Sequence, residues 1–121
     1  MPVTTVKRKL SGSTDGKNIK VVATATAGTT IHQAVAGTDV GTFDEIYLYA
    51  TNNHTAAVNL TIEFGGVASP DDNITVGLAA KSGYALIIPG LILQNGATIK
   101  AFASTANVIS IAGFVNRITE T

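Results

Sequence analysis

The stretch FDEIYLYATNN, residues 43–53, decides the fold class. Successive side chains of a β-strand point to opposite faces, and this segment alternates along most of its length. One face is aliphatic and consists of Ile46, Leu48 and Ala50. The opposite face consists of Phe43, Glu45, Tyr47 and Tyr49. We expect the aliphatic face to fill a core, which leaves open what covers the tyrosine face.

The same spacing of two recurs along the rest of the chain, where Val, Ile, Thr and Gly dominate and helical spacing is hard to find. The expected strands cover residues 20–25, 29–36, 43–51, 57–64, 73–78, 84–88, 98–103 and 108–118. Turn-forming residues separate these segments. The pattern predicts an all-β, antiparallel β-sandwich of about eight strands, with a jelly roll as the first choice and an immunoglobulin-like sandwich as the second.

Two segments predict the environment of their strands. In residues 57–64 the core-facing set is Val58, Leu60, Ile62 and Phe64. The alternating set, which we expect to face water, is Asn59, Thr61 and Glu63. Residues 108–118 carry apolar side chains on both faces, which predicts a central strand that is covered on both sides.

Two further segments carry turn signals. Asn95-Gly96 favours a turn in which both central residues have positive φ, so we expect residues 91–102 to form a hairpin. YALIIPGLIL, residues 84–93, is interpreted as a core strand that ends in a turn at Pro89-Gly90.

The length of 121 residues predicts a single domain, and the low content of charged residues suits a protein that forms part of an assembly. Only 13% of residues are charged, against about 25% in typical domains. The net charge is zero, but residues 1–20 hold five of the basic residues and one acidic residue. We therefore expect an extended basic arm at residues 1–18 and one sandwich domain at residues 19–121. Such an arm suits nucleic acid, a membrane or an acidic protein surface.

Residues for catalysis or metal binding are sparse. His32 is expected in a strand and His54 in a turn, and cysteine is absent. Asp44 and Glu45 are neighbours on a strand and point apart, whereas Asp71-Asp72 follows Pro70 and fits a turn. We expect no catalytic residue, no cofactor, no metal and no enzymatic activity.

Patterns for nucleic acid and for membranes are also missing. The aromatic residues are not interleaved with Lys or Arg, and no glycine-rich phosphate loop occurs. No run approaches the roughly 18 apolar residues of a membrane span. We therefore expect neither direct nucleic-acid binding nor a membrane partner.

Several stretches together carry a resemblance to a known family. They are the leader MPVTTVKRKLSGSTDGKNIKVVATATAGTTIHQAV, the segment FDEIYLYATNNHTAAVNLTIEFGG with its SPDD turn, LIIPGLIL, and IKAFASTANVISIAGFVNRIT. The chain resembles the jelly-roll capsid decoration proteins of tailed bacteriophages, also called cement or auxiliary proteins. The resemblance covers nearly all of the chain as a style of sequence and includes no diagnostic motif.

This resemblance implies a structural role. Such proteins bind the major capsid protein on the outside of the shell, often as trimers, and reinforce the shell against internal DNA pressure. The implied location is the exterior of the capsid in the virion, after synthesis in the host cytoplasm. The implied capsid-binding arm carries Lys7, Arg8, Lys9 and Lys17.

The resemblance also suggests what covers the tyrosines. Tyrosine is enriched at protein interfaces, so we expect Tyr47 and Tyr49, with Glu45, at the subunit interface of a homotrimer. Two alternatives remain open. The tyrosine face could be the inner face of the sandwich, which would bury Glu45. The protein could instead be a carbohydrate- or receptor-binding module of a virion tail or neck.

Overall fold

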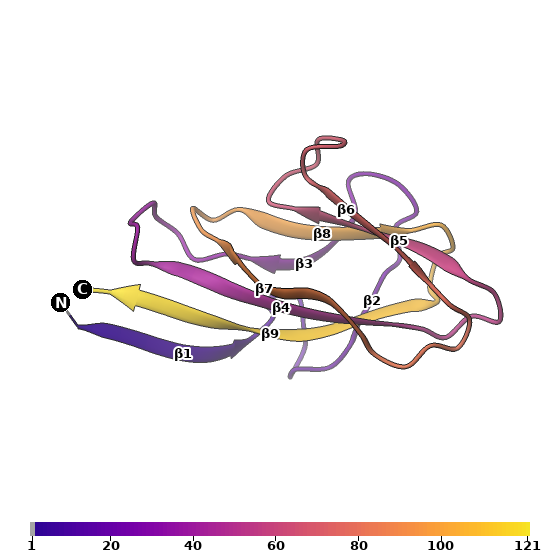
Figure 1. The fold of residues 1–121 in the computed structure, drawn as a ribbon, viewed down its shortest axis with the longest axis horizontal. Coiled ribbons are helices and arrows are strands. Elements are labelled where there is room, and N and C mark those ends of the chain that lie inside the picture. Colours follow the sequence, from indigo (N-terminus) through magenta and orange to yellow (C-terminus); the bar gives the residue numbers. More distant parts are fainter. Residues whose placement is uncertain (1) are drawn as a thin grey trace.

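Nine β-strands and their connecting turns make up the described part of the computed structural model, which covers residues 2–121 (Figure 1). The strands are β1 (Val3–Lys9), β2 (Ile19–Lys20), β3 (Thr29–Gln33), β4 (Phe43–Asn52), β5 (Val58–Phe64), β6 (Asn73–Leu78), β7 (Ala85–Leu93), β8 (Thr98–Ala103) and β9 (Ile109–Glu120). No helix occurs in this part of the chain. Only Met1 of the expected arm lies outside the described residues.

The strands form two antiparallel sheets. Sheet A has the order β1-β9-β4-β7, with β2 also paired to β9. Sheet B has the order β3-β8-β5-β6. The predicted all-β sandwich is therefore confirmed. The chain repeatedly crosses between the sheets, as in double-sheet Greek-key folds, and the jelly roll stays our interpretation of this strand order.

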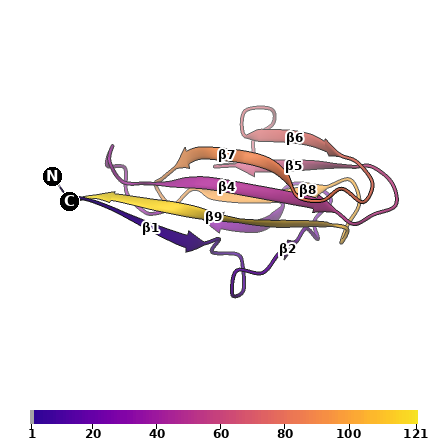
Figure 2. The ribbon, with the colours of Figure 1, turned by 60° about the horizontal axis from the view of Figure 1, so that its bottom comes forward.

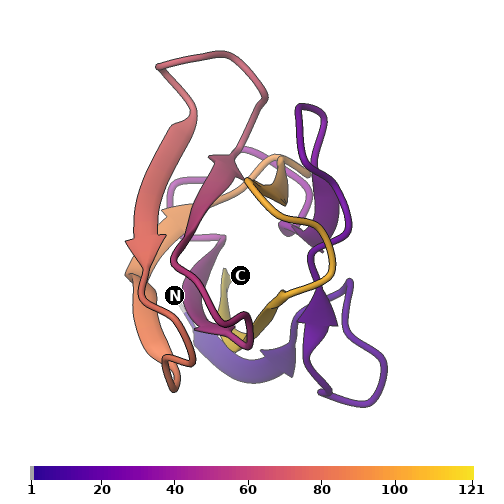
Figure 3. The same ribbon diagram turned by 90° about the vertical axis from the view of Figure 1, so that its right-hand side faces the viewer.

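The core lies between the two sheets. Figure 3 looks roughly along the strands and shows them surrounding a central space, which the core side chains fill. Its largest fully buried aliphatic side chains are Leu10, Ile31, Ile46, Leu48, Leu60, Ile62, Ile88, Ile99, Ile109 and Ile111. Each such side chain stabilises the fold by roughly 1.5–3 kcal/mol relative to an exposed position.

Strand β4 lies at the centre of sheet A, between β9 and β7. Its burial alternates strictly, and Ile46, Leu48 and Ala50 are inaccessible to solvent. The aliphatic face is thus the inner face, as predicted. The alternative in which the tyrosine side lines the interior of the sandwich is wrong, because that side points away from sheet B.

Two local expectations are wrong because of tertiary contacts. Glu63 is buried rather than wet, because the segment before β3 donates two hydrogen bonds to it, and Thr61 is buried as well. Asn95 and Gly96 have the predicted positive φ values of 62° and 65°. The strands on either side of this turn nevertheless pair in different sheets, so they form no hairpin. The Asn95 and Gly96 amides instead donate to carbonyl groups at Gly37 and Val35.

Two strands differ from the predicted environment. β7 runs through Pro89-Gly90 as one strand at the edge of sheet A, with register shifts against β4, whereas a core strand ending there was expected. Proline is tolerated at a sheet edge because it lacks an N–H group to donate. β9 is central, as predicted. Its outer side, however, is covered by no other described strand.

The N-terminal segment is part of the sandwich. β1 pairs with β9 over seven residue pairs, and β2 pairs with a more N-terminal part of the same strand. Between them the chain turns toward sheet B, where the Gly12 amide donates to the Ile31 carbonyl at 2.9 Å and Leu10 enters the core. The segment expected as an arm at residues 1–18 therefore contributes β1 to sheet A and a core side chain to the domain.

Candidate interaction surface

The outer face of sheet A carries aromatic and aliphatic side chains from three neighbouring strands. Residues directly opposite in an antiparallel pair share a face, so the register assigns its members. They are Phe43, Glu45, Tyr47 and Tyr49 on β4, Ala112, Phe114, Asn116 and Ile118 on β9, and Leu86, Pro89 and Ile92 on β7. Figure 2 views this side of the molecule, with β1, β9, β4 and β7 in front of sheet B. No other strand of residues 2–121 covers this face.

The apolar character of this face extends to its edge. Leu86 is 52% exposed and Ile92 is 56% exposed, although both are large aliphatic side chains. Single exposed aliphatic residues are common, but contiguous apolar patches mark interaction sites. The outer face of sheet A combines such residues with half-buried tyrosines, so it has the composition of a contact surface.

An aromatic stack organises the middle of the face. The rings of Tyr47 and Phe114 lie 4.8 Å apart between centroids with an interplanar angle of 18°, and the Lys7 ammonium lies 4.2 Å from the Phe114 centroid. The pKa of the Tyr47 phenol is raised, because partial desolvation and then the nearby Glu45 carboxylate disfavour the phenolate. Tyr47 therefore presents a neutral hydroxyl on an ordered aromatic platform.

Glu45 lies beside this stack. The Asn116 amide donates to its Oε1 atom at 3.0 Å. The structure thus brings Glu45, Tyr47 and Tyr49 together on one outward surface, where all three are half-buried. Their role as a subunit interface stays a prediction.

A pocket of about 410 Å³ borders the same face near Tyr49. Its lining residues are Gly16, Asn18, Tyr49, Tyr84 and Ala112. The Tyr84 hydroxyl donates to Oδ1 of Asn18 at 2.7 Å, which links the start of β7 to the loop before β2. The small side chain of Ala112 leaves room between the two tyrosines.

The basic residues predicted for the arm do not share one face. The register places Lys7 opposite Asn116 and Lys9 opposite Phe114, both on the outer side, whereas Arg8 alternates to the inner side. Lys17 lies in the loop between β1 and β2, where its carbonyl accepts the Ser13 hydroxyl at 2.6 Å. Their capsid-binding role stays a prediction.

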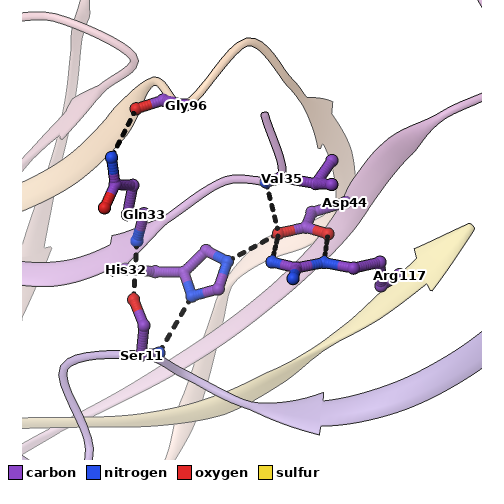
Figure 4. Close-up of polar contacts among 7 residues, drawn as sticks. All are labelled: Ser11, His32, Gln33, Val35, Asp44, Gly96 and Arg117. Atoms are coloured by element: carbon purple, nitrogen blue, oxygen red, sulfur yellow. Dashed lines mark hydrogen bonds and ion pairs between the residues drawn. The ribbon is translucent and has the colours of Figure 1, made fainter. Parts of the chain in front are cut away.

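A buried ionic cluster lies on the inner side of sheet A (Figure 4). Asp44 is fully buried and accepts four hydrogen bonds. Arg117 donates from Nε to Oδ1 at 2.8 Å and from Nη2 to Oδ2 at 3.0 Å. His32 Nε2 lies 2.8 Å from Oδ2, and the Val35 amide donates to the same oxygen at 3.2 Å. The carboxylate is therefore paired and hydrogen-bonded, as a buried charge requires.

The hydrogen bonds of this cluster fix its protonation. His32 Nδ1 accepts the Ser11 amide at 3.0 Å, so neutral His32 carries its proton on Nε2 and donates to Asp44. Burial lowers the pKa of His32 and outweighs the opposing hydrogen bond to Asp44. For Asp44, burial alone would raise the pKa, but hydrogen bonds from Arg117 and His32 prevail and lower it.

Glu63 is a second buried carboxylate, on the outer side of sheet B. It accepts hydrogen bonds from the Thr26 hydroxyl and, at 2.6 Å, from the Gly28 amide. No cation lies within ion-pair distance in the described residues. Through these hydrogen bonds, the Glu63 carboxylate holds the segment before β3 against the outer side of sheet B.

The remaining polar residues noted in the sequence have structural roles. His54 lies in the turn after β4, as predicted, and its amide donates to Asn52 Oδ1 at 2.8 Å. Asp72 accepts the Ala68 amide at 3.0 Å within the predicted turn. Within residues 2–121, no three potential metal-ligating side chains cluster.

The buried cluster was missed by sequence reasoning, although a signal was present. Asp44 shares the alternation of Ile46 and Leu48, so a carboxylate was to be expected on the core side with a partner. Arg117 follows Val115 at the same spacing of two. The third member, His32, comes from sheet B and no local pattern connects it to the others.

In comparisons with protein-family models, curated proteins and solved structures, nothing matched this chain. The described residues also include no helix that is long and apolar enough to cross a membrane.

Proposed function

We propose that the protein is a structural virion component that binds the outer surface of a tailed-phage capsid and reinforces the shell. The observation that supports this proposal is the apolar and aromatic outer face of sheet A, which no strand of the described chain covers. A surface of this composition suits adhesion to other protein subunits. The sequence resemblance to decoration proteins narrows the partner to the major capsid protein.

In this proposal the outer face of sheet A is the contact between three copies of the chain. Glu45, Tyr47 and Tyr49 lie at its centre, and the stack of Tyr47 on Phe114 gives it a rigid platform. Tyrosine supplies a large contact area with little conformational entropy to lose. The trimer then presents its basic N-terminal strands to the acidic parts of the shell.

The basic residues Lys7, Arg8, Lys9 and Lys17 supply the charge for capsid binding. Deleting residues 1–18 would also remove the buried Leu10, so charge substitution is the cleaner test. Arg8→Gln combined with Lys17→Gln should weaken binding to capsids, because neither side chain belongs to the stack on the outer face of sheet A, and Lys100→Gln on sheet B is the control. Unchanged binding by the double variant would refute a role for these charges.

The proposed function is tested by co-sedimentation of the purified protein with undecorated capsid shells of the virus that encodes it. We expect saturable pelleting with the shells, and particles that withstand a higher temperature before they release DNA. Absence of pelleting across micromolar protein concentrations would overturn the proposal.

One observation favours a second function, that of a carbohydrate-binding module. The pocket between Tyr49 and Tyr84 pairs aromatic surface with the Asn18 amide, a combination that suits a sugar ring. A glycan array probed with the wild-type protein and with Tyr84→Ala tests this candidate. Binding that is lost in the variant would support it, and an array without signal would exclude it for the glycans tested.

A further inference from the structure

A second pocket, of about 280 Å³, lies near the junction of β1 with the loop that follows it. It is lined by Arg8, Lys9, Ser11, His32 and Arg117. We propose that this pocket binds a small oxyanion, a phosphate or a carboxylate, through a set of convergent hydrogen-bond donors.

The charge of the lining is positive and unbalanced. Asp44 neutralises Arg117 through two hydrogen bonds, and it is the only carboxylate that forms an ion pair in the described part of the chain. Arg8 and Lys9 therefore have no acidic partner within 4.0 Å among residues 2–121. No Asp or Glu lines the pocket. An anion would supply the missing negative charge.

The polar atoms that remain unused at the pocket are donors. Arg117 contacts Asp44 through Nε and Nη2, which leaves Nη1 without a partner among the described residues. The Ser11 hydroxyl accepts the Gln33 amide at 2.7 Å, so its O–H group remains available to donate. The Lys9 side chain lies on the outer side of β1 and its ammonium donates to the Ser13 carbonyl at 3.0 Å, so Lys9 adds positive charge beside the pocket and is not counted among its donors.

These donors are held in place before any ligand arrives. The bidentate contact with buried Asp44 fixes the guanidinium plane of Arg117. Two hydrogen bonds fix Ser11 (Figure 4). Its backbone amide donates to His32 Nδ1, and its hydroxyl oxygen accepts the Gln33 amide. Prior ordering of this kind reduces the entropy lost on binding. A cationic pocket with spare, pre-ordered donors favours an oxyanion over a neutral ligand.

A simpler role exists for the charges on β1. Basic side chains on an exposed edge strand deter pairing with another chain. That role accounts for Arg8 and Lys9, but it needs neither the Ser11 hydroxyl nor the placement of Arg117 at the same pocket. The presence of Arg8, Ser11 and Arg117 at one pocket is what the oxyanion site explains.

The test is a titration of the full chain with inorganic phosphate at constant ionic strength, in which NMR chemical shifts are recorded at each phosphate concentration. We expect saturable shifts at the Ser11 and Gln33 amides and at the Arg117 side chain. Arg8→Gln should weaken binding by about tenfold or more, because a charge-assisted hydrogen bond is lost. Arg8 is exposed, so this variant should fold as the wild type does, which its spectrum will show.

The controls separate a site from general attraction to a basic surface. Lys100→Gln, on sheet B, removes the same charge away from the pocket and should leave the affinity unchanged. A parallel titration with acetate reports whether carboxylates share the site, and saturable binding of either anion supports the proposal. Shifts that do not saturate, or equal weakening by Arg8→Gln and Lys100→Gln, would overturn it.

Discussion

The outer faces of the two sheets differ, although their inner faces fill the same core. Sheet A presents aromatic and aliphatic side chains. Sheet B has a mostly polar set on its outer side, in which Asn59 and Thr75 are exposed, Lys100 is half-buried, and Thr61 and Glu63 are buried. A polar outer face is ordinary for an antiparallel sheet that faces water. The core does not require the apolar face of sheet A, and our proposal assigns this face to a contact between subunits.

The two faces also differ in how the chain covers them. On sheet B, Glu63 fastens the segment around Thr26 and Gly28 over the outer side. On sheet A no strand of residues 2–121 lies over Tyr47 and Tyr49, although the loop around Asn18 borders the pocket beside Tyr49. β4 and β5 alternate in a similar way in the sequence, but their outer faces differ in the structure. The outer face of β5 is partly covered by the protein's own chain, whereas the tyrosines of β4 are only half-buried.

The largest expected effect comes from the inner face. Arg117→Met leaves the buried Asp44 charge without its main partner and should lower the free energy of unfolding by about 3–5 kcal/mol. Urea denaturation measures the loss. Glu45→Gln, next in sequence to Asp44 but on the outer face, should change it by about 0.5 kcal/mol or less. Equal effects of the two variants would contradict the assignment of faces.

The next effect tests the cover of sheet B. Glu63→Ala leaves the Gly28 amide without its acceptor and should cost about 1–3 kcal/mol. Hydrogen exchange should also accelerate at Gly28, because the segment before β3 loses its attachment. Thr75→Ala, on the same outer face, is the matched control. Unchanged exchange at Gly28 would show that other contacts hold this segment.

A pH effect of intermediate size is expected at the inner cluster. The pKa of His32 is lower in the folded protein than its ordinary 6.5, so the unfolded chain binds more protons below that pH. Stability should therefore fall as the pH decreases from 7 to 5, and the low pKa of Asp44 should add a further loss below about pH 4.

Thermal denaturation over this range checks the sign of the effect. His32→Gln should lower stability at pH 7 and flatten the slope between pH 7 and 5. His54→Gln, in the turn after β4, is the control and should keep the slope. A protein that becomes more stable on acidification would contradict the neutral, buried His32.

The smallest effect concerns the aromatic stack on sheet A. Lys7→Gln removes the cation above Phe114 and should cost about 0.5–1 kcal/mol at this exposed site. The loss should diminish in Phe114→Leu, since the ring that attracts the cation is gone. A double-mutant cycle, measured by urea denaturation, gives the coupling free energy between Lys7 and Phe114. A coupling of zero would show that the contact contributes nothing to stability.

The sequence predicted the sandwich and the faces of β4 because alternation is a local property of the chain. It did not predict that the Asn95-Gly96 turn connects two sheets, since turn chemistry determines local φ values and leaves strand partners open. The ionic cluster joins His32, Asp44 and Arg117 from three distant segments. Such a cluster depends on the register of sheet A and on its packing against sheet B, which no local pattern encodes.

The central claim is that the outer face of sheet A is a contact between protein subunits. Light scattering coupled to size exclusion, at two salt concentrations, tests it most directly. We predict a trimer for the wild type, and a folded monomer for the combined Tyr47→Ser and Tyr49→Ser variant. The matched variant on sheet B, Asn59→Ser with Thr75→Ser, should remain trimeric. A monomeric wild type, or a tyrosine variant that stays trimeric, would contradict the claim.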